Sequence, residues 1–326
     1  MRTSVLLVVA VSAAGLASLA LPALSQDPAA QKPVKTLNGH KKNVYSLAFD
    51  ATGKMLASAA ADDTVRTWSL ETGKQIAMLK HDGPAYCVAY SPDGSTLATA
   101  SGDKKVRLWD GKSDKAGSTL IGHTGPVYSL AFSPAGGTLA TGGGEDDFTC
   151  KIWNLKTGEP EPPFKGHRRP VYGIAFSADG TTLASSSSDK TVRVWEVKTG
   201  TALQVLEGHG NHVYRCAFAP RGSILASASQ DRSVRLWNVA TGKSAGVLKG
   251  HNDQVYGAAF CPKNNLLATT SDDRTVRLWD TKTNELKRTL TGHDGPVFAV
   301  AISPDGRFLA SGGGDRTIRV WDLGEN

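Results

Sequence analysis

The chain contains seven copies of a histidine, a hydroxyl residue and an aspartate, the residue types of a Ser-His-Asp catalytic triad. Each aspartate lies six positions before a tryptophan, and each hydroxyl residue follows a Leu-Ala pair. A nucleophile needs an exposed hydroxyl and an oxyanion hole, and the sequence indicates neither. Seven equal copies favour a structural role, so we predict that the protein is not an enzyme. The seven sets are His40, Ser58, Asp62, Trp68; His81, Thr99, Asp103, Trp109; His123, Thr141, Asp147, Trp153; His167, Ser185, Asp189, Trp195; His209, Ser227, Asp231, Trp237; His251, Thr269, Asp273, Trp279; and His293, Ser311, Asp315, Trp321.

Two other patterns suggest metal or phosphate chemistry only weakly. His209 and His212 form an H-x-x-H pair, but no third ligand is evident, so His212 is interpreted as a loop histidine. The glycine-rich run at residues 142–147 contains Glu145 and Asp146 where a phosphate would approach, and no helix is expected after it. We therefore predict no metal and no cofactor.

A repeat with a period in the low forties positions these residues. Six Gly-His pairs and one Lys-His variant mark its start, and the last five tryptophans are each 42 positions apart. Histidine early and tryptophan late in such a unit resembles the WD-repeat family, which has four strands per blade. The resemblance covers everything after an N-terminal linker, and it implies that each set of four residues is a hydrogen-bonded structural tetrad. The pairs are Gly39-His40, Lys80-His81, Gly122-His123, Gly166-His167, Gly208-His209, Gly250-His251 and Gly292-His293.

Four short β-rich runs separated by turn residues make up each repeat. Residues 212–218, 223–229, 233–239 and 244–250 show them in one copy, and Ser-Pro-Asp-Gly turns such as Ser91–Gly94 indicate hairpins. A single blade cannot bury both of its faces, so the blades must stack into a closed ring. The last repeat ends after its third strand, and residues 33–38 match the fourth. We predict an all-β, seven-bladed WD-repeat propeller of four antiparallel strands per blade, in which the N-terminal strand completes the last blade.

An aromatic residue follows each repeat histidine by five positions. The resemblance implies that this position faces the mouth of the central channel, where partners commonly bind. Two interpretations remain open: the aromatics bind a partner, or they are inherited through duplication and only fill the channel. We favour a scaffold that binds a protein or peptide; small-ligand capture at the same mouth is the alternative, and an enzymatic propeller is third. The candidate partner-binding residues are Tyr45, Tyr86, Tyr128, Tyr172, Tyr214, Tyr256 and Phe298.

The first residues are typical of a secretory signal peptide. Arg2 precedes an uncharged apolar stretch, and Ala23 and Ser25 are the small residues of a cleavage site. We predict a signal peptide at residues 1–25, a linker at residues 26–32 and the propeller at residues 33–326. The protein is then expected to be exported, periplasmic or extracellular, and not stably inserted in a membrane. An uncleaved membrane anchor is the alternative.

Net charge bears on the class of partner, and the positions of the cysteines bear on disulfide formation. The formal net charge is +7, but the basic residues recur around the repeats and form no stripe, so nucleic acid is not an expected partner. The four cysteines are Cys87, Cys150, Cys216 and Cys261. Cys150 replaces a valine of the repeat and Cys216 a leucine, so each is interpreted as a small buried hydrophobe in a separate blade, and no disulfide is expected. We expect a monomer.

Overall fold

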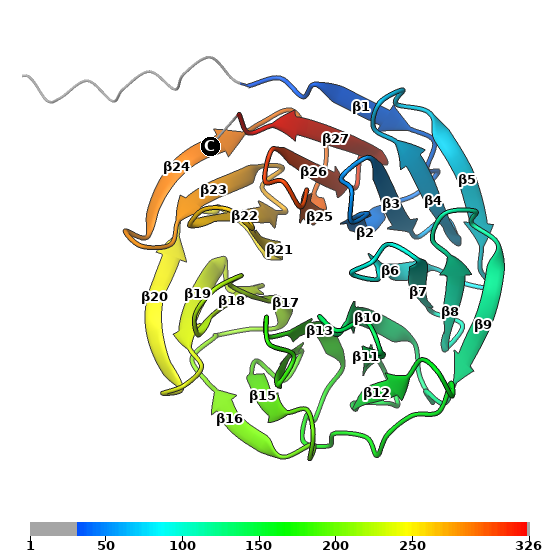
Figure 1. The fold of residues 1–326 in the computed structure, drawn as a ribbon. Coiled ribbons are helices and arrows are strands. Elements are labelled where there is room, and N and C mark those ends of the chain that lie inside the picture. Colours follow the sequence, from blue (N-terminus) through cyan, green and yellow to red (C-terminus); the bar gives the residue numbers. More distant parts are fainter. Residues whose placement is uncertain (1–30, 325–326) are drawn as a thin grey trace, which may run out of the picture. The chain divides into compact units, whose positions relative to one another are not determined.

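The computed structural model of the protein describes residues 31–324. Seven antiparallel sheets follow one another around a central channel, and six of them have four strands (Figure 1). This arrangement confirms the predicted all-β, seven-bladed fold. The predicted signal peptide lies outside the described residues, as does most of the predicted linker. Within the described residues, no helix is long and apolar enough to cross a membrane.

The four strand positions of a blade recur at increasing distance from the channel (Figure 1). The innermost strands are β2 (Val44–Phe49), β6 (Ala85–Tyr90), β10 (Val127–Phe132), β13 (Val171–Phe176), β17 (Val213–Phe218), β21 (Val255–Phe260) and β25 (Val297–Ile302). The second strands are β3 (Met55–Ala60), β7 (Thr96–Ser101), β11 (Thr138–Gly143), β14 (Thr182–Ser187), β18 (Ile224–Ser229), β22 (Leu266–Ser271) and β26 (Phe308–Gly313). The third strands are β4 (Thr64–Ser69), β8 (Lys105–Asp110), β12 (Cys150–Asn154), β15 (Val192–Glu196), β19 (Ser233–Asn238), β23 (Val276–Asp280) and β27 (Thr317–Asp322). The outermost strands are β5 (Gln75–Lys80), β9 (Ala116–Ile121), β16 (Ala202–Leu206), β20 (Lys243–Lys249), β24 (Glu285–Leu290) and β1 (Lys35–Asn38).

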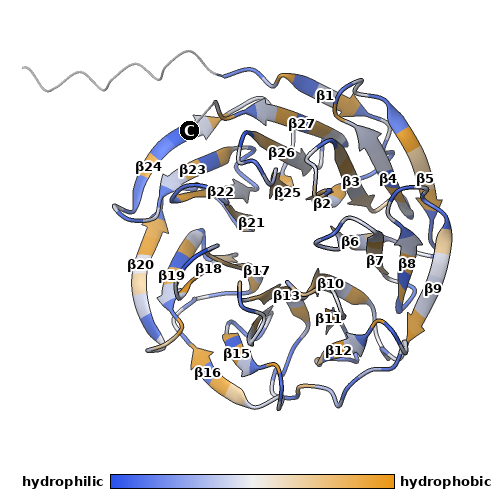
Figure 2. Cartoon of the chain, in the orientation of Figure 1, coloured by the Kyte–Doolittle hydropathy of each residue, from blue (hydrophilic) through white to orange (hydrophobic). Residues whose placement is uncertain are grey.

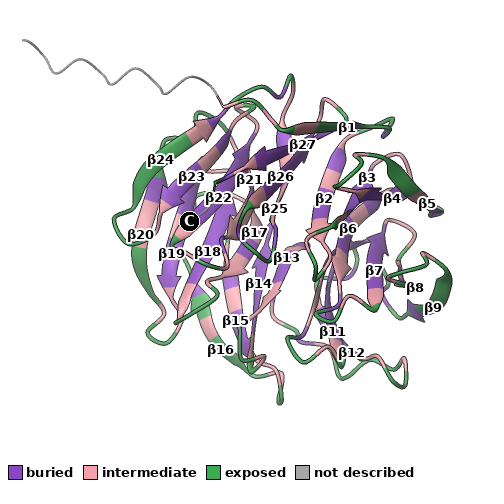
Figure 3. Ribbon diagram, turned by 45° about the horizontal axis from the view of Figure 1, so that its top comes forward, coloured by how far each residue is buried: buried purple, intermediate pink, exposed green. Residues whose placement is uncertain are grey.

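Burial changes across each blade. The second strands are rich in alanine, serine, threonine and glycine, and five of the six residues in each are buried. Small side chains let neighbouring blades pack on both faces of these strands. The outermost strands are largely exposed, and hydrophobic and hydrophilic residues are intermixed along them (Figures 2 and 3). The core is therefore a series of apolar layers between successive blades.

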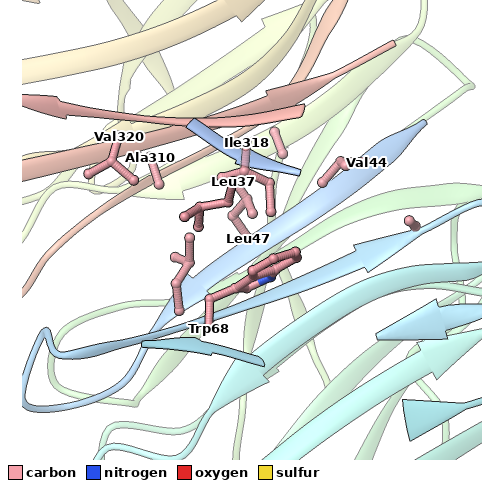
Figure 4. Close-up of a cluster of buried hydrophobic side chains, with 10 residues drawn as sticks. Leu37, Val44, Leu47, Trp68, Ala310, Ile318 and Val320 are labelled. Atoms are coloured by element: carbon pink, nitrogen blue, oxygen red, sulfur yellow. The ribbon is translucent and has the colours of Figure 1, made fainter. Parts of the chain in front are cut away.

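The ring is closed by pairing between the two ends of the described chain. Strand β1 pairs antiparallel with β27, with Leu37 opposite Ile318, and the Val34 amide donates to the Val320 carbonyl over 2.8 Å. Leu37 is only 2% exposed and packs in a cluster that joins blade seven to blade one (Figure 4). Trp68 of blade one belongs to the same cluster. The prediction that the N-terminal strand completes the last blade is confirmed.

Blade three differs from the predicted four strands. Its sheet contains only β10, β11 and β12, and the outer segment touches β12 through two isolated bridges, Cys150 with Phe164 and Trp153 with Pro160. Proline has no amide hydrogen to donate to a strand ladder, and this segment also contains Pro162 and Pro163. Phe164 is nevertheless buried at 5% exposure. The segment keeps its apolar anchor but loses its regular pairing.

Candidate functional site

The tetrads form one hydrogen-bond relay per blade, and blade five shows it. The Trp237 indole nitrogen donates to Ser227 Oγ over 2.8 Å, and Ser227 Oγ lies 2.7 Å from Nε2 of His209. Nδ1 of His209 is 2.7 Å from Asp231 Oδ2. With the Nδ1 proton directed at Asp231, Nε2 accepts from the serine hydroxyl, so every polar group of the relay has a partner.

The hydroxyl groups of the tetrads are inaccessible to a substrate. All seven hydroxyl residues are 0% exposed, and each accepts an indole N–H at 2.8–2.9 Å. A catalytic serine needs a free hydroxyl in reach of the substrate and an oxyanion hole beside it. The arrangement supports strand packing and not catalysis.

The tetrad aspartate also holds the turns on either side of it. The Gly210 amide donates to Asp231 Oδ2 over 2.9 Å, and the Ser233 hydroxyl donates to Oδ1 over 2.6 Å. Burial opposes ionisation of Asp231, but the hydrogen bonds from His209 and Ser233 outweigh it and hold the pKa of this carboxyl far below its usual range. Asp231 therefore remains a carboxylate at neutral pH.

Replacing Asp231 with alanine should destabilise the fold by roughly 1–3 kcal/mol, because it removes the acceptor for several buried or half-buried donors. The measurement is the free energy of unfolding in denaturant. Glu207→Ala is the matched control, since Glu207 is an exposed carboxylate in the connection that leads from blade four into the same blade. Equal stability of the two variants would show that the relay contributes nothing measurable.

Blade two departs from the predicted tetrad. His81 Nε2 lies 2.8 Å from Thr99 Oγ1, but among the described residues His81 Nδ1 has no hydrogen-bond partner. Asp103 instead forms an ion pair with Arg107 at 2.6 Å. The predicted contact between His81 and Asp103 is therefore absent in this blade.

The substitution of glycine by Lys80 explains this departure. At five of the six glycines that precede a tetrad histidine, an added Cβ would lie close to the third-strand arginine, for example 2.7 Å from Arg277 Nη1 at Gly250. Lys80 carries that Cβ, so Arg107 cannot occupy the same space and lies against Asp103. Burial, followed by the Arg107 charge, lowers the pKa of His81 to about 4.

The seven predicted partner-binding aromatics form a continuous ring around the channel mouth. Neighbouring ring centroids are 4.8–5.8 Å apart all the way round, as in packed aromatic pairs. Every member is only partly buried. Together with Arg215 they line an open cavity of about 310 Å³, and we call this ring of Tyr45, Tyr86, Tyr128, Tyr172, Tyr214, Tyr256 and Phe298 the aromatic ring.

A β-bulge places each aromatic residue in the ring. In all seven blades the pairing of the first and second strands skips the aromatic position, as between Val213 and Arg215 around Tyr214. A bulge leaves one residue unpaired and redirects its side chain. This bulge was not predicted from the sequence. An aromatic residue followed in most repeats by a small one is the signal that accompanies it.

Polar groups stand beside the aromatic ring at its rim. The Tyr128 hydroxyl donates to Glu145, and the Tyr214 hydroxyl donates to Gln254 over 2.9 Å. Burial, followed by the hydrogen bond to Glu145 and its charge, raises the pKa of Tyr128 above its usual range, and burial raises that of Tyr214 to about 12. The tyrosine hydroxyls therefore stay protonated and can donate at neutral pH.

The glycine-rich insertion of blade three delivers Glu145 to this rim. A Cβ at Gly144 would lie 2.6 Å from Cε2 of Tyr128, so only glycine lets the loop pass so close to the aromatic ring. The glycine-rich run is visible in the sequence, but the position of Glu145 at the channel mouth was not predicted from it.

His212 also belongs to the rim. Its imidazole stacks on Tyr214 with an interplanar angle of 14° and contacts the Ser188 hydroxyl through Nδ1. Among residues 31–324, no group of three or more histidine, cysteine, aspartate or glutamate residues is arranged to hold a metal ion.

Comparisons with known proteins identify the same repeat. A family model described as "WDR3 first beta-propeller domain" matches residues 151–323, more than half of the chain. A second, described as "WD domain, G-beta repeat", matches residues 31–69, 73–110 and 115–154.

Several curated proteins match over about one repeat. A "WD repeat, SAM and U-box domain-containing protein 1" of Danio rerio is 41% identical over 51 residues, which is 16% of this chain and 10% of that protein. A "Coronin-like protein" of Saccharomyces cerevisiae is 41% identical over 56 residues, 17% of this chain and 9% of that protein. A "Ribosome biogenesis protein erb1" of Aspergillus niger is 52% identical over 42 residues, which is 13% of this chain and 5% of that protein. The matched segments thus span a tenth or less of these proteins.

Proposed function

The chain belongs to the WD-repeat β-propeller family, and from this premise we propose that it is a non-enzymatic scaffold that binds a protein or peptide through the aromatic ring. Propellers of this family generally serve as non-enzymatic platforms for protein interaction. The short matches to proteins named for ribosome biogenesis or as coronin-like support the repeat type alone, because they span a tenth or less of each relative's length.

The continuous aromatic ring is the observation that carries the proposal. Seven partly exposed aromatic side chains surround one opening, and tyrosine combines a large apolar contact with a hydroxyl donor at little cost in rotamer entropy. Aromatic anchors at the centre of an interface commonly account for most of its binding energy. The test is quantitative capture of the partner by the wild type and by a variant with a disrupted ring.

The size of the cavity favours a partner's side chain over a free small molecule. Small-molecule sites commonly enclose about 300–1,000 Å³ and bury most of their ligand. The mouth cavity, at about 310 Å³, lies at the lower limit of this range and is open to solvent. It fits one or two inserted side chains of a larger partner.

The rim supports the expectation that nucleic acid is not a partner. Glu145 and Asp272 each accept a hydrogen bond from a tyrosine of the aromatic ring. Two carboxylates beside the opening repel a phosphate backbone, and binding to nucleic acid depends on neutralising that backbone.

We also propose that the protein is exported and that its leader is removed. The proposal rests on Arg2, the apolar stretch after it and the small residues Ala23 and Ser25. Mass spectrometry of the native protein should find the N-terminus at or near Gln26. A Ser25→Leu variant should retain the leader, because a bulky residue blocks the cleavage site. A membrane-bound native chain that begins at Met1 would contradict the proposal.

A further inference from the structure

Arg215 places a cation at the floor of the channel mouth. The residue that follows the ring aromatic is small in the other six blades, where it is Ser46, Cys87, Ser129, Gly173, Gly257 or Ala299. In blade five this residue is Arg215. Its side chain lines both the mouth cavity and a second cavity of about 180 Å³ further along the channel. A ligand that passes the aromatic ring therefore meets the Arg215 guanidinium.

No carboxylate neutralises Arg215 among the described residues. Its Nη1 lies 3.4 Å from the Tyr172 carbonyl oxygen in blade four and 3.9 Å from Cys87 Sγ in blade two, so the side chain reaches across the channel. Neither contact supplies a carboxylate, and no carboxylate oxygen of residues 31–324 lies within 4.0 Å of its nitrogens. Of the six third-strand arginines, Arg66, Arg107, Arg277 and Arg319 each contact a carboxylate. Arg193 and Arg235 instead lie over the tryptophan of their own blade.

We propose that the channel mouth recognises a carboxylate of the partner, and that Arg215 binds it. This inference rests on the proposed function and names the chemistry of its ligand: a peptide segment that presents either its C-terminal carboxylate or an aspartate or glutamate side chain. The planar guanidinium fork matches a carboxylate with two parallel hydrogen bonds. The partly desolvated channel strengthens such a pair relative to bulk water.

The rim adds a requirement on the residues beside that carboxylate. Glu145 and Asp272 flank the opening through their hydrogen bonds with Tyr128 and Tyr256, so they repel a bare anion on its way in. A lysine or arginine next to the carboxylate would contact these acids, and its charge would also suit the π faces of the aromatic ring. The best ligand is therefore a segment with a carboxylate at its tip and a basic residue immediately before it.

Three synthetic peptide libraries test the carboxylate directly. All contain basic residues at the same positions; one ends in a free carboxylate, one ends in an amide, and one ends in an amide but carries an internal glutamate. The wild type should retain at least one of the two carboxylate libraries about tenfold or more better than the neutral library. The better retained one identifies a C-terminus or a side chain as the source. Equal retention of all three libraries, or retention of none, would overturn the proposal.

An Arg215→Ser variant tests the assigned residue. Serine occupies this position in blades one and three, so the fold should be kept, while affinity for the retained peptides should fall about thirtyfold or more. Arg221→Gln is the matched control, since it removes a positive charge from an exposed turn of the same blade. Arg215→Lys should lose less affinity than Arg215→Ser, because it keeps the charge but not the fork.

The melting temperature separates recognition from a structural role. Arg215→Ser removes a partly buried cation without a carboxylate partner, so its Tm should equal or exceed that of the wild type. A Tm as low as that of Asp231→Ala would assign Arg215 to holding the channel together and would overturn the proposal. If a serine-substituted aromatic ring loses the peptides while Arg215→Ser retains them, this inference fails and the proposed function stands. If the substituted ring keeps full affinity, the proposed function itself fails.

Discussion

A variant with serine at Tyr128, Tyr172 and Tyr214 should lose partner binding altogether while keeping most of its stability. These three neighbours form one continuous arc of the aromatic ring, with centroids 5.4 and 5.6 Å apart. Truncating one aromatic anchor at the centre of an interface typically costs about 2 kcal/mol or more, which corresponds to roughly thirtyfold in affinity. Three such losses of binding free energy should make the affinity too weak to detect. The three side chains are only half-buried, and their removal leaves the tetrads paired.

The measurement is a binding isotherm with the partner first captured by the wild type from the exported fraction, together with thermal unfolding of each variant. Ile76, Leu203 and Leu286 changed together to serine provide the control, because they are exposed apolar residues of the outermost strands, away from the channel. If the ring variant folds normally and binds the partner as tightly as the wild type, the aromatic ring is inherited filler and the interface lies elsewhere.

A chain shortened to begin at Gly39 should be less stable by roughly 3–5 kcal/mol and should associate into oligomers. The truncation removes β1, and with it the ladder to β27 and the buried Leu37 side chain. Losing a buried leucine alone commonly costs about 2–5 kcal/mol. The outer edge of β27 becomes an unpaired row of backbone donors and acceptors, which is the feature through which strands of separate molecules pair.

A chain beginning at Gln31 is the matched control, since it keeps β1. Calorimetry and analytical ultracentrifugation give the Tm and the mass of both chains. A point variant separates the apolar contact from the backbone pairing: Leu37→Asp should mimic much of the destabilisation, whereas Thr36→Asp, on the exposed side of β1, should not. An unchanged Tm and a monomeric mass for the shortened chain would contradict the closure of the ring through β1.

The blade count was predictable because the repeat markers recur every 41–44 positions and each copy folds as a local meander. The partner of β27 was also predictable, since residues 33–38 match the fourth strand of every other repeat. The loss of the outer strand in blade three was not anticipated, although its prolines are visible in the sequence. The repeat pattern predicts the same four strands in every copy, but proline lacks the amide hydrogen that a regular strand ladder needs.

Part of the candidate site was likewise predictable from the sequence, and part was not. The tetrad members and the ring aromatics recur at fixed offsets, so their positions could be read from the repeat. The pairing of Arg107 with Asp103 could not be predicted from the repeat, because it depends on how close the Cβ of Lys80 comes to the arginine in space. The approach of Glu145 to Tyr128 likewise depends on the path of an inserted loop. The binding role of the aromatic ring stays a prediction.

The closure through β1 and β27 has a consequence for the order in which the ring forms. Six blades are built from strands that are adjacent in the chain, so each needs only short loops to close and can form early. Blade seven alone joins the two ends of the described chain, and the entropy cost of that loop is the largest in the molecule. We therefore expect the pairing of β1 with β27 to form last, after the final repeat has been synthesised. In a chain that crosses a membrane starting from its N-terminus, β1 crosses first. It then stays unpaired until β27, the last strand, has also crossed.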